Sequence, residues 1–192
     1  LVYLLFQNFG MRVILFAGWG AGQVEANPAD TALTMQALVF LGLGFAFWLA
    51  IFPFYTWIPL LFSEVFPFQA GFMLNFLPLV VLLLGLDFIN AFAWLRGFAD
   101  FQQVFRLVGI IMVATGGIWS AFQKNVSRII GYAIIVEIGF SLLALSLRSH
   151  IGYQVYVSMF MPRIIALAVW SLALSGLDVE TYDYENLTGL VR

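Results

Sequence analysis

The sequence predicts an all-α integral membrane protein of about six transmembrane helices. Of its 192 residues, 63% are hydrophobic and 9% are charged, and the mean hydropathy is +1.00. An average soluble chain, by comparison, carries about 25% charged residues. Six apolar stretches approach the roughly 20 residues that cross a bilayer as a helix. They are residues 1–17, 34–52, 70–89, 104–122, 128–147 and 152–177.

The linkers between these stretches are short, so we expect residues 1–192 to form a single transmembrane helical domain. The first stretch begins on apolar residues without a basic leader, so we expect no signal peptide. Arg12 in the first stretch and Asp87 near the end of the third are expected at membrane interfaces. Basic residues fall on both sides of the six spans, so the membrane orientation stays open.

The second apolar stretch ends in a segment that contains Pro53, Trp57 and Pro59. Proline lacks a backbone N–H and clashes with the preceding helical turn, so this pair of prolines interrupts the helix. In lipid, opened backbone persists only where protein or a water-lined cavity satisfies it. We therefore expect non-helical backbone at residues 53–59, with Trp57 near the break. Such a broken helix is typical of transport or ion-handling folds rather than of a simple anchor.

The fifth stretch carries Glu137 in its middle. A comparable charge at the centre of a membrane helix is unfavourable by roughly 2.5–3.5 kcal/mol. We therefore expect Glu137 to face the interior of the bundle, protonated or paired with a cation from a neighbouring helix. Two interpretations stay open, a proton or ion relay and a structural hydrogen bond or ion pair.

The last stretch contains Pro162 followed by Arg163. The proline frees a carbonyl in the preceding turn, and the arginine could donate to it. We favour a different role for Arg163, in which it packs or extends its head group to the membrane interface.

Redox and metal chemistry are not expected in this chain. It has no cysteine and a single histidine, His150. This composition excludes disulfides, thiolate metal sites, histidine clusters and iron–sulfur ligation by cysteine.

Two motifs of the chain have a familiar order and spacing. The first is P-F-Y-T-W-I-P at residues 53–59, followed by Pro67 and Asn75. The second is Q-K-N-V-S-R-I-I-G-Y at 123–132, followed by E-I-G-F at 137–140. Together they resemble signatures of the antiporter-like membrane subunits of respiratory complex I and of Mrp-type cation/proton antiporters. The resemblance covers about residues 35–192, and the six spans are fewer than in a full family member, which implies a truncated or split subunit.

The departures from this family concern its titratable residues. A family lysine that takes part in proton transfer at the broken helix corresponds here to Trp48. A second lysine, on a later helix, corresponds to Ala168, with Arg163 more than a turn away. The chain contains one lysine, Lys124. Other family lysine and histidine positions fall on Tyr55, Asn75, Ser127 and Glu137.

The resemblance implies a membrane-arm subunit of a complex I-like NADH:quinone oxidoreductase, without catalytic residues of its own. It implies an energy-transducing membrane, either the mitochondrial or the bacterial inner membrane. Its partners would be lipid and other membrane subunits of a multi-subunit complex, and not nucleic acid. NADH, FMN, iron–sulfur clusters and quinone are expected in those partner subunits, so that this chain binds no cofactor.

A proton path needs groups that gain and lose protons near neutral pH. Arginine stays charged and tryptophan does not titrate, so we expect proton translocation to be weakened or lost in this portion. The candidates for remnants of the path are Glu137, Tyr55, Ser127, Asn75 and Arg163. Two alternatives stay open. One is an active Mrp-like cation/proton antiporter subunit that uses Glu137, and the other is an unrelated multi-span transporter.

Overall fold

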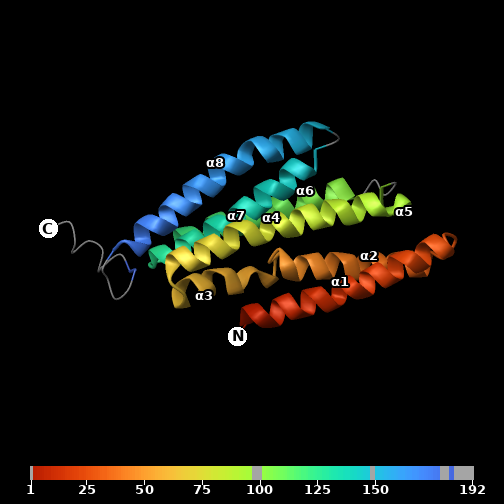
Figure 1. The fold of residues 1–192 in the computed structure, drawn as a ribbon, viewed down its shortest axis with the longest axis horizontal. Coiled ribbons are helices and arrows are strands. Elements are labelled where there is room, and N and C mark those ends of the chain that lie inside the picture. Colours follow the sequence, from red (N-terminus) through yellow and green to blue (C-terminus); the bar gives the residue numbers. More distant parts are fainter. Residues whose placement is uncertain (1, 97–100, 148–149, 178–181, 184–192) are drawn as a thin grey trace. The chain divides into compact units, whose positions relative to one another are not determined.

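A computed structural model describes residues 2–96, 101–147, 150–177 and 182–183, and Figure 1 shows its helices. The elements are α1 (Val2–Ala26), α2 (Thr31–Trp48), the 3-10 turn η1 (Phe54–Thr56), α3 (Trp57–Glu64), α4 (Pro67–Ala91), α5 (Ala93–Arg96), α6 (Phe101–Ala121), α7 (Val126–Leu145) and α8 (His150–Ser175). By length and composition, α1, α2, α4, α6, α7 and α8 can each cross a membrane. The prediction of an all-α membrane fold with six spans is confirmed.

Helix α1 is longer than the apolar stretch that predicted it. It continues to Ala26 because small side chains on one face are fully buried in the packed hairpin. Ala17 and Ala21 are each 1% exposed, and Val24 is 2% exposed. Arg12 is the eleventh of its 25 helical residues. The interfacial position expected for Arg12 stays a prediction.

The chain divides into two compact units, and the single domain expected for residues 1–192 stays a prediction. The first unit contains α1, α2 and the residues of α4 from Pro78 onward. Its α1 and α2 pack as an antiparallel hairpin (Figure 1). Asp30 begins α2, because its Oδ1 accepts hydrogen bonds from the N–H groups of Ala32 at 2.9 Å and Leu33 at 3.2 Å.

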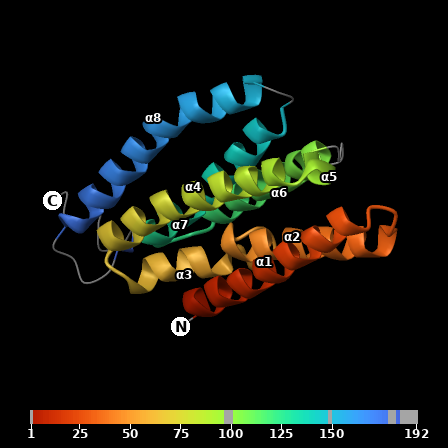
Figure 2. The same cartoon turned by 45° about the vertical axis from the view of Figure 1, so that its right-hand side comes forward.

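The second unit contains α3, α6, α7, α8 and the residues of α4 up to Leu77. Helix α7 is the centre of this unit. Half of the residues in its most apolar 18-residue window are buried, compared with 17% in the corresponding windows of α6 and α8. Helices α6 and α7 run side by side (Figure 2), and their backbones approach closely at Gly109 and Gly139. Small residues of this kind let membrane helices pack closely. On another face of α7, Gly131 lies against Pro59 of α3.

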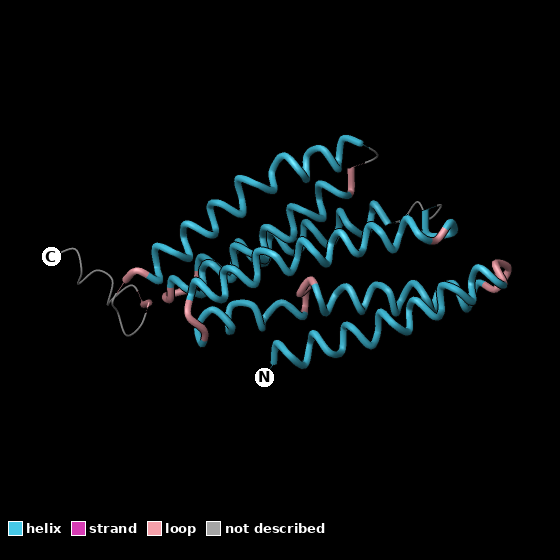
Figure 3. The backbone as a smooth tube through the Cα atoms, viewed as in Figure 1, coloured by secondary structure: helices cyan, strands magenta, loops and turns pink. Residues whose placement is uncertain are grey.

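The predicted helix break lies between α2 and α3 (Figure 3). Helix α2 ends at Trp48, and Ala50 adopts a φ of 50°, a left-handed conformation that stops the helix. The N–H of Ile51 donates to the carbonyl of Ala46 at 2.9 Å, so the opened backbone is partly satisfied by the chain itself.

The break lies earlier in the chain than the expected 53–59, because α2 ends at Trp48 and α3 already begins at Trp57. Pro59 is the third residue of α3 rather than part of the non-helical segment. This position is compatible with helix, since the first N–H groups of a helix have no intrahelical partner for proline to remove.

Candidate functional site

An ion pair between two membrane helices lies in the second unit. Arg163 of α8 places its Nε 2.7 Å from Oε2 of Glu137 on α7. The side chain of Arg163 is 15% exposed and that of Glu137 is 30% exposed. The cation expected beside Glu137 is thus Arg163. The favoured interfacial or packing role of Arg163 stays a prediction, and this ion pair is a contact that the sequence did not assign to it.

Neighbouring groups hold the arginine in place. Its Nη1 donates a long hydrogen bond of 3.4 Å to Oγ of Ser141, and its Nη2 donates to Sδ of Met159. The guanidinium carbon lies 5.6 Å from the centre of the Phe140 ring, within the range of a cation–π contact. Ser141 in turn donates to the carbonyl of Glu137 at 2.9 Å. These contacts fix one orientation of the guanidinium relative to the carboxylate.

The two charged groups of the pair are in direct contact. Oε2 of Glu137 is buried, and its separation of 2.7 Å from Nε of Arg163 is as short as that of a charge-assisted hydrogen bond.

Tyr55 belongs to a second polar group, at a different face of α7. It is buried in η1 at 6% exposure and interacts electrostatically with Tyr132, which also interacts with Arg128. Arg128 and Tyr132 are four residues apart and share a face of α7. Glu137 is nine residues after Arg128, about half a helical circumference away at 3.6 residues per turn. The polar group around Tyr55 and the Glu137–Arg163 pair therefore lie on different faces of α7.

Ser127 and Asn75 are both buried, at 1% and 9% exposure. Ser127 precedes Glu137 by ten residues, about 15 Å along the axis of α7. Asn75 comes from α4. Of the predicted path residues, the structure joins Glu137 and Arg163 in direct contact.

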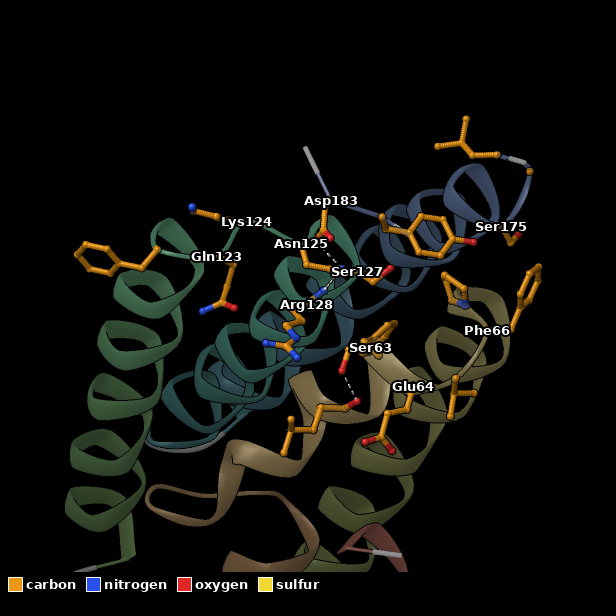
Figure 4. A pocket seen from close by; sticks show the side chains of 18 residues that line it. Ser63, Glu64, Phe66, Gln123, Lys124, Asn125, Ser127, Arg128, Ser175 and Asp183 are labelled. Atoms are coloured by element: carbon orange, nitrogen blue, oxygen red, sulfur yellow. Dashed lines mark hydrogen bonds between the residues drawn. The ribbon is translucent and has the colours of Figure 1, made fainter. Parts of the chain in front are cut away.

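Ser127 lines a pocket of about 1180 Å³ that opens among the ends of α3, α7 and α8 and the start of α4 (Figure 4). Its charged lining residues come from three segments, and they are Glu64, Lys124, Arg128 and Asp183. Figure 4 shows Arg128 on α7 and Glu64 on α3 within this pocket. Oγ of Ser127 and Nε of Arg128 are buried without a hydrogen-bond partner among the described residues. The pocket is therefore polar and can accommodate water or a charged group.

The first turn of α7 is capped beside this pocket. Asn125 accepts from the N–H of Arg128 at 3.2 Å, and its Nδ2 donates to Oδ1 of Asp183 at 3.0 Å. The N–H of Val126 donates to the carbonyl of Tyr182 at 2.8 Å. The amide groups of this helix end are therefore largely satisfied by protein atoms.

The helix break in the first unit is lined by aromatic groups. The indole Nε1 of Trp48 donates to the carbonyl of Gln7 on α1 at 3.0 Å. Phe47 and Phe54 flank the break with ring centres 4.6 Å apart, and Phe6 contacts both. The opened backbone at this position is thus covered by packed rings and a neighbouring helix, one of the two ways in which a membrane tolerates it.

The comparisons with known proteins agree with these features. The family model described as NADH:quinone oxidoreductase/Mrp antiporter, transmembrane, matches residues 5–191. The chain belongs to this family. The alternative of an unrelated multi-span transporter is thereby set aside.

Several curated members of the antiporter family are similar to the chain. NADH-quinone oxidoreductase subunit N of Beijerinckia indica is 27% identical over 89% of the chain and 36% of its own length. NAD(P)H-quinone oxidoreductase chain 4 2 of Trichodesmium erythraeum is 26% identical over 98% and 34%. NADH-quinone oxidoreductase subunit M of Buchnera aphidicola is 27% identical over 82% and 32%. The chain thus spans about a third of these relatives, and no solved structure matches it.

The sequence did not predict the contacts of Ser141 and Met159 with Arg163, or the polar face of α7 that carries Arg128. A signal for Ser141 was available, because it follows Glu137 by one helical turn and shares its face. The charged residues of the pocket gave no such signal, since they come together only through the packing of helix ends that are far apart in sequence.

Proposed function

We propose that this chain is a section of an antiporter-like membrane subunit of a complex I-like NADH:quinone oxidoreductase. Its role there is structural, and proton translocation is weakened or lost in this section. Family membership and the names of the relatives support the first part of the proposal. The partners are other membrane subunits of the complex, in an energy-transducing membrane. NADH, FMN, iron–sulfur clusters and quinone belong to those partners.

The observation that carries the structural role is the ion pair of Glu137 with Arg163. A relay group must gain and lose a proton near neutral pH. Arginine remains protonated in proteins, so it cannot pass a proton on. The pair therefore acts as a fixed salt bridge between α7 and α8. In this proposal, Tyr55, Ser127 and Asn75 are polar remnants of a former proton path.

The test is Glu137→Gln in the full protein that carries this segment, assembled in its complex and reconstituted into vesicles. The amide keeps the size and polarity of the side chain but cannot carry the proton. We expect the ratio of protons pumped to electrons transferred to stay at the wild-type value at normal complex abundance. Asp87→Asn, at an exposed position near the end of α4, is the matched control for loss of one carboxylate.

A second candidate function is an active Mrp-like cation/proton antiporter that uses Glu137. The observation that favours it is a mid-span carboxylate whose side chain is 30% exposed. A large fall in the pumping ratio for Glu137→Gln, with the complex intact, would favour this function over the structural one. Cation-driven proton flux in vesicles, abolished by the same substitution, would identify it directly.

A further inference from the structure

Oppositely charged residues line the pocket of the second unit without pairing. Arg128 comes from the first turn of α7 and Glu64 from the end of α3, and Figure 4 shows both at this pocket with no hydrogen bond between them. Neither residue forms an ion pair within the described part of the chain. Nε of Arg128 is buried without a hydrogen-bond partner there. The pocket therefore holds a cation and an acid that do not neutralise each other directly.

The hydroxyl of Ser127 is a second unpartnered group of this pocket. Ser127 is 1% exposed, and its Oγ has no hydrogen-bond partner among the described residues. A buried polar group without a partner is unfavourable, and each such group in a folded protein calls for an explanation. Ser127 and Arg128 both line the pocket, and Lys124 adds an exposed positive charge to the same lining. This side of the pocket therefore offers hydrogen-bond donors and positive charge to an anionic acceptor.

The pocket lies at one membrane boundary. Helices α4 and α7 begin beside it, at Pro67 and Val126. Helices α6 and α8 end beside it, at Ala121 and Ser175. Each of these four helices can cross a membrane, and the helix ends around the pocket all belong to the second unit. Because the ends of spanning helices lie at the level of the lipid headgroups, the pocket lies at that level too.

The lining also contains apolar side chains that are exposed. They are Leu60, Phe66 and Phe122. The volume of about 1180 Å³ is somewhat larger than the roughly 300–1,000 Å³ of typical small-molecule sites. The pocket therefore has room for a ligand with a polar end and an apolar end.

These features suit a zwitterionic phospholipid better than an anionic lipid or a segment of protein. The charged lining residues, Glu64, Lys124, Arg128 and Asp183, are two acids and two bases, whereas pockets for anionic headgroups are basic. A phosphoethanolamine headgroup carries a phosphate and a primary ammonium a few bonds apart and continues into acyl chains. A protein segment would have to bring an acid, a base and apolar side chains to the same place. A primary ammonium donates hydrogen bonds to a carboxylate, which the quaternary ammonium of choline cannot do.

We propose that this pocket binds the headgroup of a phosphatidylethanolamine molecule. The phosphate accepts hydrogen bonds from Arg128 and Ser127, the ammonium donates to Glu64, and the acyl chains lie along Phe66 and Phe122. The site goes beyond the proposed function, because it concerns lipid binding and involves neither Glu137 nor proton transfer.

Photo-labelling of the full protein, assembled in its complex, tests this site. The complex is reconstituted into phosphatidylcholine vesicles with a small fraction of phosphatidylethanolamine that carries a diazirine near the start of one acyl chain. The adducts are mapped by mass spectrometry. We expect them on peptides that contain Phe66 or Phe122. The same label on phosphatidylcholine or phosphatidylglycerol should give a yield about fivefold lower at these peptides.

Substitutions of the charged residues give the headgroup dependence. Glu64→Gln removes the partner of the ammonium, so the phosphatidylethanolamine yield should fall about fivefold. The lining then carries a net positive charge, so labelling by phosphatidylglycerol should rise. Arg128→Gln should lower the phosphatidylethanolamine yield about tenfold, because a charge-assisted hydrogen bond to the phosphate is lost. The matched controls, at exposed positions of α1 and α6, are Glu25→Gln and Arg106→Gln, and both should keep the wild-type yields.

Inorganic phosphate distinguishes a lipid headgroup from a free anion. It lacks the ammonium and the acyl chains, so we expect millimolar phosphate to leave the adduct yield unchanged. A loss of the adduct would assign the site to a phosphate ion and overturn the proposal.

Three further outcomes would overturn the lipid site. They are equal labelling by the three lipids, yields unchanged in both Glu64→Gln and Arg128→Gln, and, with benzoylphenylalanine in place of Phe122, an adduct with a protein segment instead of lipid. Normal abundance of the complex and normal electron transfer in each variant show that it has folded. The pumping ratio of Glu137→Gln tests the proposed function separately, so that either proposal can fail while the other stands.

Discussion

At the scale of single residues, the Glu137–Arg163 pair makes a prediction about stability. Arg163→Leu leaves a carboxylate at mid-span without its cation. Breaking a fully buried pair costs roughly 3–5 kcal/mol, and we expect about 1–3 kcal/mol here because both side chains are partly exposed. The measurement is the thermal unfolding midpoint of the purified protein in detergent, which should fall by several degrees.

The double variant separates loss of the pair from loss of packing. Glu137→Gln removes the unpaired charge, so Arg163→Leu combined with it should recover most of the lost stability. Arg163→Lys keeps the charge but loses the donors to Ser141 and Met159, and we expect an intermediate midpoint. Equal midpoints for Arg163→Leu with and without Glu137→Gln would contradict a stabilising ion pair.

The inward orientation of Glu137 could be predicted from the sequence, but its partner could not. Helical side chains lean toward the N-terminus, so Arg163 covers the level of Met159, four residues earlier. In the antiparallel pair of α7 and α8, that level is close to the level of Glu137. Spacing from the connecting turn places Arg163 itself about a turn past that level, so spacing alone does not pair it with Glu137.

At the scale of elements, the α1–α2 hairpin depends on the absence of a side chain at Gly10. A Cβ there would meet Cδ1 and Nε1 of the Trp48 indole, which is held by its hydrogen bond to Gln7. We expect Gly10→Ala to destabilise the protein by about 1–3 kcal/mol through overpacking. A lower thermal midpoint in detergent is the measurement.

The same helix supplies the control. Gly22 has open space around its Cα, so Gly22→Ala should be neutral, or stabilising by up to about 1 kcal/mol through helix propensity. A smaller side chain at position 48 should relieve the clash, so that Gly10→Ala costs less in a Trp48→Leu background than in the wild type. If Gly10→Ala behaved like Gly22→Ala, the close packing of α1 on Trp48 would be refuted.

The existence of the six long helices followed from the sequence, whereas their bounds depended on packing, and η1, α3 and α5 were not predicted. Glycines and polar residues between Gly18 and Glu25 lower the hydropathy at the end of α1, although burial of Ala17 and Ala21 keeps it helical. The break after α2 followed from Pro53, because proline cannot continue a helix. Pro59 lies in the first turn of α3, where proline is tolerated. The spacing of the two prolines does not show which of them lies outside a helix and which lies in a first turn.

At the scale of the whole molecule, the long helices differ in how far they are buried. In α1, 11% of the residues in the most apolar 18-residue window are buried, compared with 50% in α7. Exposed apolar faces do not by themselves require protein neighbours, since lipid tails cover them equally well. Polar groups inside a membrane do require polar partners, and Glu137 and Arg163 meet this need by pairing with each other.

The last prediction concerns the membrane-arm assembly. After extraction in a mild detergent, the full protein that carries this segment should purify with other membrane subunits, because the proposed function places it among them and membrane helices associate through packing and polar contacts. Native mass spectrometry measures which membrane subunits co-purify. As a control, membranes labelled with a heavy isotope are mixed with unlabelled membranes before extraction, and complexes without mixed labels exclude association after solubilisation. We expect a stronger detergent to release the subunit at the same time as its thermal midpoint falls. Monodisperse single subunits surrounded by lipid, with no co-purifying membrane protein under the mild condition, would contradict a role in a multi-subunit membrane arm.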